Sequence, residues 1–246
     1  MRYLFFDIEC SDGLHICSFG YIVINDNFEI LEKEDIVINP QWKFKLGRDG
    51  FDPRIHLAYD TQTFAKQKPF PYHYEKIKKL LTLPDQVILG HSVDSDIYYL
   101  QKACERYDLE QIKINAYDTQ EFYYQIDNKF KRRALEKIVQ DLEIDVSHLH
   151  EHKSCDDAEI SMLTAKSICS KLSISLNELL YLCDNCKKEL NTSRIEHKRI
   201  EKEINEIIKN YLDKKHWKKI CLAENLYIEN EKLNKFFSNV FYLNSF

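Results

Sequence analysis

The stretch Tyr3-Leu-Phe-Phe-Asp-Ile-Glu9 opens the chain with two carboxylates at the end of an otherwise apolar segment. Its side chains alternate as in a β-strand, so that Asp7 and Glu9 share one face and Ile8 lies on the other. A carboxylate beside buried apolar side chains is costly unless a cation meets it. Oxygen ligands of this kind suit Mg²⁺ or Mn²⁺. Taken alone, the pair is explained equally well by two solvated acids at a strand end.

The segments that follow alternate between predicted strands and predicted helices. Their periodicity predicts strands at 15–24, 30–38, 86–89 and 112–116. It predicts helices at 73–81, 94–107, from about 119, 134–142, 155–172 and 176–182. Strands first, followed by alternating strands and helices, predict an α/β fold whose central sheet has both antiparallel and parallel pairs.

Two further acids and one histidine stand at predicted helix starts. Asp96 lies in the first turn of its helix, where the helix dipole is by itself a sufficient reason for a carboxylate. Asp157 follows Ser154 at the spacing of a capping box, which predicts a role in the helix start. His152 directly precedes that helix. Each residue alone has a local explanation, so only their order along the chain adds information.

That order resembles a known family. Asp7-Ile-Glu9, Gly90-His-Ser-Val-Asp-Ser-Asp96 and His152-Lys-Ser-Cys-Asp-Asp157-Ala look like the three motifs of the DEDDh 3′→5′ exonucleases. This family includes the proofreading epsilon subunit of bacterial DNA polymerase III and the oligoribonucleases. The resemblance implies a ribonuclease-H-like fold, with a mixed central sheet flanked by helices, over residues 1–174. After about residue 175 the chain becomes more charged, and we expect a helical C-terminal extension over 175–246.

The resemblance also implies the roles of the site residues. Asp7, Glu9, Asp96 and Asp157 would hold two Mg²⁺ or Mn²⁺ ions, and His152 would activate the attacking water. His91 also stands five residues before an acid, Asp96, but only His152 follows the middle motif. Lys153 stands where the tyrosine subclass has its tyrosine, which indicates the histidine subclass.

Some positions near the expected substrate depart from the family pattern. Cys10 and Ser11 replace the usual Thr-Thr, and Ser92 replaces an Asn that follows His91. We expect Cys10, Ser11 and His91 to lie near the terminal nucleotide. A basic run at 129–133 includes Arg132 and Arg133, and it fits a phosphate contact as well as it fits a solvated loop.

These motifs predict a metal-dependent 3′→5′ exonuclease. It would hydrolyse phosphodiester bonds at 3′ ends of single-stranded nucleic acid, DNA somewhat favoured over RNA, and release nucleoside 5′-monophosphates. One alternative is a nuclease of the same fold that cuts internally, which the spacing of His152 and Asp157 disfavours. The other is a catalytically inactive ribonuclease-H-like module for nucleic-acid binding or assembly.

Composition limits the remaining possibilities. The 246 residues have a formal net charge of −5, so a strongly basic nucleic-acid-binding surface is not evident. Eight cysteines without a secretory apolar segment predict buried thiols in a reducing cytoplasm, and we expect no membrane association. Cys183 and Cys186 have zinc-like spacing but lack a second pair. The basic tail could dimerise, contact a polymerase or nucleic acid, or pack on its own domain.

Overall fold

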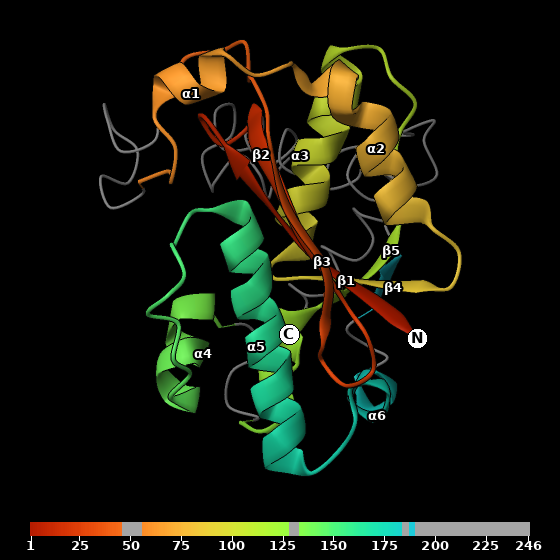
Figure 1. Cartoon of the computed structure of the whole chain (residues 1–246). Coiled ribbons are helices and arrows are strands. Elements are labelled where there is room, and N and C mark those ends of the chain that lie inside the picture. Colours follow the sequence, from red (N-terminus) through yellow and green to blue (C-terminus); the bar gives the residue numbers. More distant parts are fainter. Residues whose placement is uncertain (46–55, 128–132, 184–186, 190–246) are drawn as a thin grey trace, which may run out of the picture. The chain divides into compact units, whose positions relative to one another are not determined.

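The computed structural model describes residues 1–45, 56–127, 133–183 and 187–189 (Figure 1). For residues 187–189 only the backbone is described. The chain divides into two units, 1–195 and 196–246, and all of the second lies outside the described residues. None of the described helices is both long enough and apolar enough to span a bilayer.

One mixed sheet forms the centre of the first unit, in the order β3-β2-β1-β4-β5-β6. Its strands are β1 (Arg2–Cys10), β2 (Ile16–Ile24), β3 (Ile30–Val37), β4 (Gln86–Gly90), β5 (Asn115–Asp118) and β6 (Lys187–Glu189). β1 pairs antiparallel with β2 and parallel with β4, and β4 pairs parallel with β5. β2 and β3 are antiparallel, as are β5 and β6. The predicted mixed α/β sheet is therefore confirmed.

Helices cover both faces of this sheet. They are α1 (Thr61–Ala65), α2 (Phe70–Thr82), α3 (Val93–Arg106), α4 (Leu135–Leu142), α5 (Ser154–Leu172) and α6 (Leu176–Leu182). Figure 1 shows α2 and α3 on one side of the strands and α4 and α5 on the other. In β1, Leu4 and Phe6 pack towards α2 and α3, whereas Tyr3 and Phe5 pack towards α4, α5 and α6. The alternation read from the sequence thus divides the core into two clusters.

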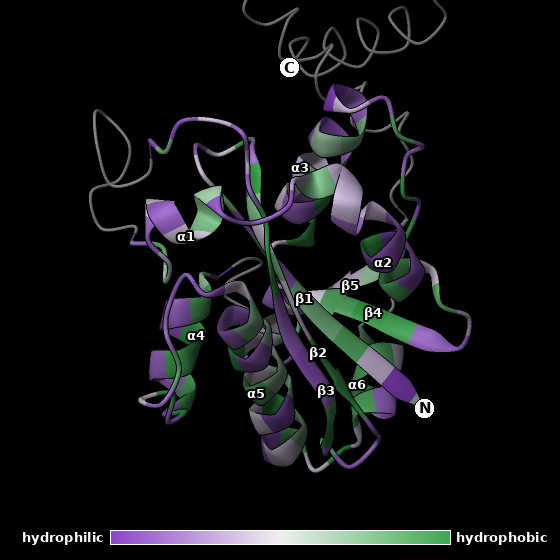
Figure 2. Ribbon diagram, turned by 45° about the horizontal axis from the view of Figure 1, so that its top comes forward, coloured by the Kyte–Doolittle hydropathy of each residue, from purple (hydrophilic) through white to green (hydrophobic). Residues whose placement is uncertain are grey.

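The outer strand β3 differs from its neighbours. Its first four residues are exposed, whereas all nine residues of β2 are buried. Figure 2 shows a similar difference between β3, which is largely hydrophilic, and β4 inside the sheet, which is largely hydrophobic. The charged side chains of β3 suit the edge of a sheet, where they discourage pairing with another chain.

One predicted helix, from about Thr119, was wrong. The chain forms two short 3₁₀ turns instead, η1 (Thr119–Glu121) and η2 (Tyr123–Gln125). The Asp118 carboxylate accepts from the N–H of Gln120 and so begins a tight turn. The aromatic residues that follow have modest helix propensity, and Phe122 and Tyr123 are buried in the core instead.

The expected domain boundary at 174 also needs adjustment. α6 lies beyond it, yet Leu176 and Leu179 are buried in the same cluster as β1 and α5. β6 is a strand where the sequence predicted only helix, and it extends the sheet at β5. The first unit therefore continues past 174, and a helical extension over 190–246 stays a prediction outside the described residues.

The cysteines behave as expected where they are described. All six are buried and carry no disulfide: Cys10, Cys17, Cys104, Cys155, Cys169 and Cys183. Cys183 is only 1% exposed, within the apolar cluster of α5 and α6. Cys186 lies outside the described residues.

Candidate active site

Five residues predicted from three distant motifs line one cleft of about 660 Å³. Asp7 and Glu9 come from the end of β1, and Asp96 from the first turn of α3 after β4. Asp157 comes from the first turn of α5, and His152 from the turn before it. β1 and β4 are parallel, so their carboxyl ends present these groups at the same edge of the sheet.

Glu9, His152 and Asp157 form a close group within this cleft. Nδ1 of His152 lies 3.2 Å from Oε1 of Glu9. One ligand atom from each of the three residues lies within 4.8 Å of the others, an arrangement that could hold a metal ion. His152 has a left-handed backbone, with φ of 60°, and its side chain is 28% exposed. The ring therefore reaches both the acids and the open cleft.

The acids are too crowded to be ionised together without a cation. Burial raises the pKa of Asp7, and Asp96, Asp157 and Glu9 raise it further. Burial, followed by repulsion from Glu9, raises the pKa of Asp157 to about 8. Burial and Glu9 likewise raise the pKa of Asp96, whose Oδ2 is buried with no hydrogen-bond partner among the described residues. Clustered carboxylates with an orphaned oxygen fit divalent cations.

The neighbouring acids raise the pKa of His152 as well, which for a histidine favours the charged form. Its hydrogen bond to Glu9 raises its pKa, although partial burial opposes this. The pKa thus lies above the ordinary value of 6.5, and the ring carries a proton more readily than a free histidine.

The start of α5 reaches the acids because β2 has a glycine beneath it. Gly20 pairs laterally with Asp7 on one side and with Asp35 on the other. A Cβ at Gly20 would lie 1.9 Å from the backbone N of Cys155 and 2.0 Å from the C of Ser154. No side chain fits there, so the first turn of α5 rests directly on the strand and brings Asp157 towards Asp7.

Hydrogen bonds hold this helix start in place. Oγ of Ser154 lies 2.6 Å from Asp35 Oδ1 and 2.9 Å from Ser18 Oγ, so it donates to the carboxylate and accepts from Ser18. The Tyr59 hydroxyl donates to the other oxygen of Asp35 at 2.8 Å. The N–H of Ala58 donates to the carbonyl of His152 at 3.3 Å. Ser154 therefore bonds to the sheet and the helix has no side-chain cap, so a capping box does not explain Asp157.

The other predicted site residues divide into two groups. Cys10 and His91 line the cleft, and burial lowers the pKa of His91 to about 4. Ser11 is fully buried, and the cleft lining does not include it. The guanidinium of Arg133 pairs with Asp141 and lies 5.5 Å from the ring centre of Tyr123, outside the cleft lining. Arg132 lies outside the described residues.

The structure adds cleft residues that the sequence analysis missed. Tyr99 stands three residues after Asp96 on α3, a spacing that could have identified it. An apolar wall comes from α4 and the segment after it: Leu135, Val139, Val146 and Leu149. Nothing in the sequence marks these four side chains, because apolar residues at helical spacing usually belong to the core.

The comparison with family models decides the classification. The model described as "DNA polymerase III subunit epsilon-like, C-terminal domain" of the DEDDh type matches residues 22–168. The chain belongs to this DEDDh family. The match includes Asp96, His152 and Asp157 of this epsilon-like DEDDh protein. Asp7 and Glu9 precede the match, and the pairing of β1 with β2 and β4 brings them to the same cleft.

Solved structures share the fold of this DEDDh protein at low identity. The nuclease domain of 3′hExo, a DEDDh family member bound to rAMP, is 17% identical, with a TM-score of 0.54 over 75% of this chain and 92% of that one. A 3′-exonuclease that recognises the histone mRNA stem-loop is 15% identical, with a TM-score of 0.55 over 78% and 71%. Exonuclease X, in complex with 5′ overhanging duplex DNA, is 11% identical, with a TM-score of 0.52 over 72% and 96%. Among curated proteins, none matches. The predicted ribonuclease-H-like fold is confirmed.

Proposed function

We propose that the protein is a metal-dependent 3′→5′ exonuclease that releases nucleoside 5′-monophosphates from single-stranded nucleic acid. The observation that carries this proposal is the meeting of Asp7, Glu9, Asp96, Asp157 and His152 in one cleft. Family membership supports hydrolysis of nucleic acid by such a set.

The four acids would hold two divalent cations, Mg²⁺ or Mn²⁺. Bound there, such ions supply Lewis-acid stabilisation of a phosphate and lower the pKa of a bound water. The raised pKa values of Asp7, Asp96 and Asp157 support the assignment, because cations would compensate both the burial and the mutual repulsion of these carboxylates.

His152 is the candidate general base. Its ring lies between the Glu9 carboxylate and the open cleft, and it can accept a proton from water near neutral pH. The N–H of Ala58 fixes the carbonyl of His152, so the backbone is held while the side chain stays accessible.

The substrate end would enter between the acids and the apolar wall. Leu135, Val139 and Leu149 give the cleft that holds the carboxylates an apolar part on which a base could pack. Such a surface would accept any base and either sugar, so a preference for DNA over RNA would depend on the positions that depart from the family pattern. These are Cys10, in place of the usual Thr, and the residue after His91, where Ser92 replaces the usual Asn. A homodimer or a polymerase contact through 175–246 stays a prediction.

The decisive experiment is digestion of oligonucleotides labelled at the 5′ end with Mn²⁺ present. A ladder that shortens from the 3′ end is the expected result, for DNA more than for RNA. Cuts at internal positions would contradict exonuclease action. An unchanged substrate would favour the inactive binding module.

A further inference from the structure

A second hollow, of about 250 Å³, has the opposite electrostatic character to the candidate active site. Among the described residues that line it, none carries a carboxylate and three carry basic groups: His15, Lys102 and Arg106. His15 bonds to the Asp12 carboxylate and Lys102 to Glu105, both outside the lining, so Arg106 supplies the main positive charge for a ligand. The first cleft is lined by six carboxylate side chains: Asp7, Glu9, Asp96, Glu136, Glu151 and Asp157. We call the second one the cationic hollow. A phosphate group is attracted there without any metal, whereas the first cleft needs cations to accept one.

The cleft and the cationic hollow lie next to each other along α3. Asp96 and Tyr99 line the cleft, and Ala103 and Arg106 line the hollow. Steps of three, four and three residues place all four on one face of the helix. The rise of about 1.5 Å per residue separates Asp96 from Arg106 by about 15 Å. Roughly four stacked nucleotides, at about 3.4 Å each, cover that distance.

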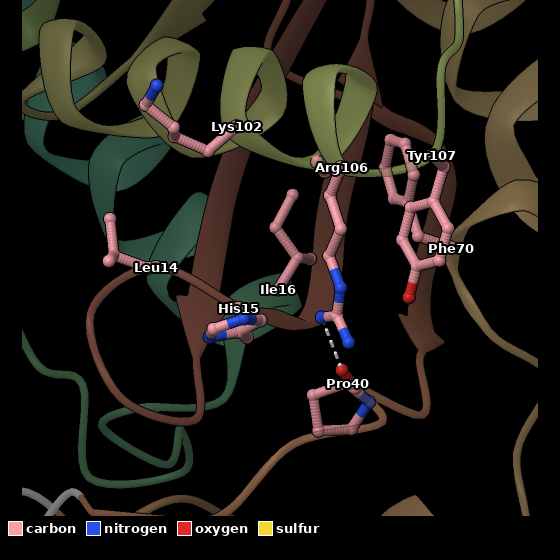
Figure 3. A pocket seen from close by; sticks show the side chains of 9 residues that line it. Leu14, His15, Ile16, Pro40, Phe70, Lys102, Arg106 and Tyr107 are labelled. Carbon is pink, nitrogen blue, oxygen red and sulfur yellow. Dashed lines mark hydrogen bonds between the residues drawn. The ribbon is translucent and has the colours of Figure 1, made fainter.

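Two hydrogen bonds to backbone carbonyls fix the orientation of the Arg106 guanidinium. Its two terminal nitrogens donate to the carbonyls of Pro40, at 2.8 Å, and of Gln41, at 3.1 Å. Figure 3 shows the guanidinium extending from the helix into the hollow beside His15, with the bond to Pro40 dashed. A guanidinium has five N–H groups, so these two bonds fix its orientation and leave three for a phosphate.

An exposed aromatic side chain stands beside this arginine. Trp42 is 51% exposed, stacks on His15 with ring centres 4.6 Å apart, and lies 5.8 Å from the Arg106 guanidinium. Aromatic rings combined with cations bind single-stranded nucleic acid without reading its sequence. Lys102 lines the hollow with its stem, while its ammonium bonds to Glu105, a surface pair of little strength.

We infer that the cationic hollow is a second subsite for the substrate strand, an inference that rests on the proposed exonuclease function. It would hold a phosphate on Arg106 and a base on Trp42, about four nucleotides upstream of the 3′ end. A dinucleotide in the cleft is too short to reach it. Activity should therefore increase with substrate length until the strand spans both sites.

The test compares kcat/KM for a dinucleotide and for a strand of about eight nucleotides. In Trp42→Ala and Arg106→Gln, kcat/KM for the longer strand should fall about tenfold while that for the dinucleotide stays within about twofold. Tyr72→Ala is the matched control, because Tyr72 is an exposed ring near Lys68 at 5.7 Å that lines neither site. It should leave both substrates unaffected.

The outcomes separate this inference from the proposed function. Equal losses at both lengths, or no loss in Trp42→Ala, would overturn the subsite. If the wild-type protein digests neither substrate, the exonuclease proposal fails. Anisotropy titration of the labelled longer strand without metal then decides the subsite, because unchanged affinity in Trp42→Ala overturns it and weakened affinity supports it.

Discussion

At the scale of single residues, His152 could serve either as a base or as a metal ligand. Its Nδ1 lies 3.2 Å from Oε1 of Glu9. Its ligand atom also lies within 4.8 Å of those of Glu9 and Asp157, so the three could bind one metal ion. As a base, its replacement in His152→Gln should lower kcat about 10²- to 10⁴-fold and leave the Mn²⁺-induced rise in melting temperature intact. Steady-state kinetics and thermal melts check this. Loss of the melting shift together with activity would make His152 a ligand instead.

Asp7 is a proposed metal ligand that we expect to destabilise the metal-free fold. Burial and four neighbouring acids raise its pKa, so the metal-free fold must either keep Asp7 protonated or bear the repulsion. Asp7→Asn should raise the melting temperature in chelator, remove the shift caused by Mn²⁺, and abolish activity. Asp145→Asn is the control, since Asp145 is exposed, lines neither hollow and bonds to Ser147 on the surface. A lower melting temperature for Asp7→Asn in chelator would contradict the argument.

At the scale of elements, the contact between β2 and α5 sets the geometry of the cleft. Gly20→Ala would place a Cβ 1.9 Å from the backbone of Cys155, and neither backbone can yield without moving the helix start. We expect a loss of about 1–3 kcal/mol in unfolding free energy by urea titration. A fall in kcat should accompany it, because Asp157 and His152 move with α5. Full activity in the folded variant would disprove this coupling.

The role of the hydrogen bond to Asp35 can be tested by comparing two tyrosines whose hydroxyls bond to carboxylates, one beside the start of α5 and one away from it. Tyr59 donates to Asp35 beneath the start of α5. The Tyr21 hydroxyl lies away from the cleft, 2.5 Å from Glu32 and 2.9 Å from Glu34. Tyr59→Phe and Tyr21→Phe should each lower the unfolding free energy by about 1 kcal/mol. Only Tyr59→Phe should also reduce kcat, by about three- to tenfold, since only Tyr59 helps to position His152. Equal kcat values for both variants would show that Asp35 has a structural role alone.

At the scale of the whole molecule, the acid cluster links folding to pH and metal. The pKa of Asp157 is raised to about 8, whereas the pKa of an aspartate in the unfolded chain is about 3.9. Between these values the metal-free folded protein keeps a proton that the unfolded chain has lost. Stability should therefore fall as pH rises, by about 1.4 kcal/mol per pH unit for each such proton. Urea titrations in chelator from pH 5 to 8 measure this slope.

Divalent cations should flatten that dependence. Cations compensate the carboxylate charges directly, so with saturating Mn²⁺ the protons are no longer needed and stability should vary little over the same range. The gain from Mn²⁺ should thus be larger at pH 8 than at pH 5. Parallel curves with and without Mn²⁺ would refute a metal site at these acids.

Local patterns in the sequence were sufficient for most of the elements, and the resemblance to the family pointed to five residues that line one cleft. The alternation from Tyr3 to Glu9 predicted both the strand and which side chains lie on each face, because strand geometry depends only on neighbouring residues. The order of the three motifs identified Asp96, His152 and Asp157, although each alone fitted a helix start. The helix from about Thr119 was predicted wrongly, because burial of Phe122 and Tyr123 outweighed the local pattern.

Only the tertiary structure decided how distant segments meet. Three contacts join residues on different elements: Gly20 with the first turn of α5, Ser154 with Asp35, and Arg133 with Asp141. The cationic hollow likewise combines the turn after β1, the loop around Pro40 and the end of α3. The physical reason is that such contacts depend on the register of the sheet and the packing of helices on it. Local propensity and spacing carry no information about either.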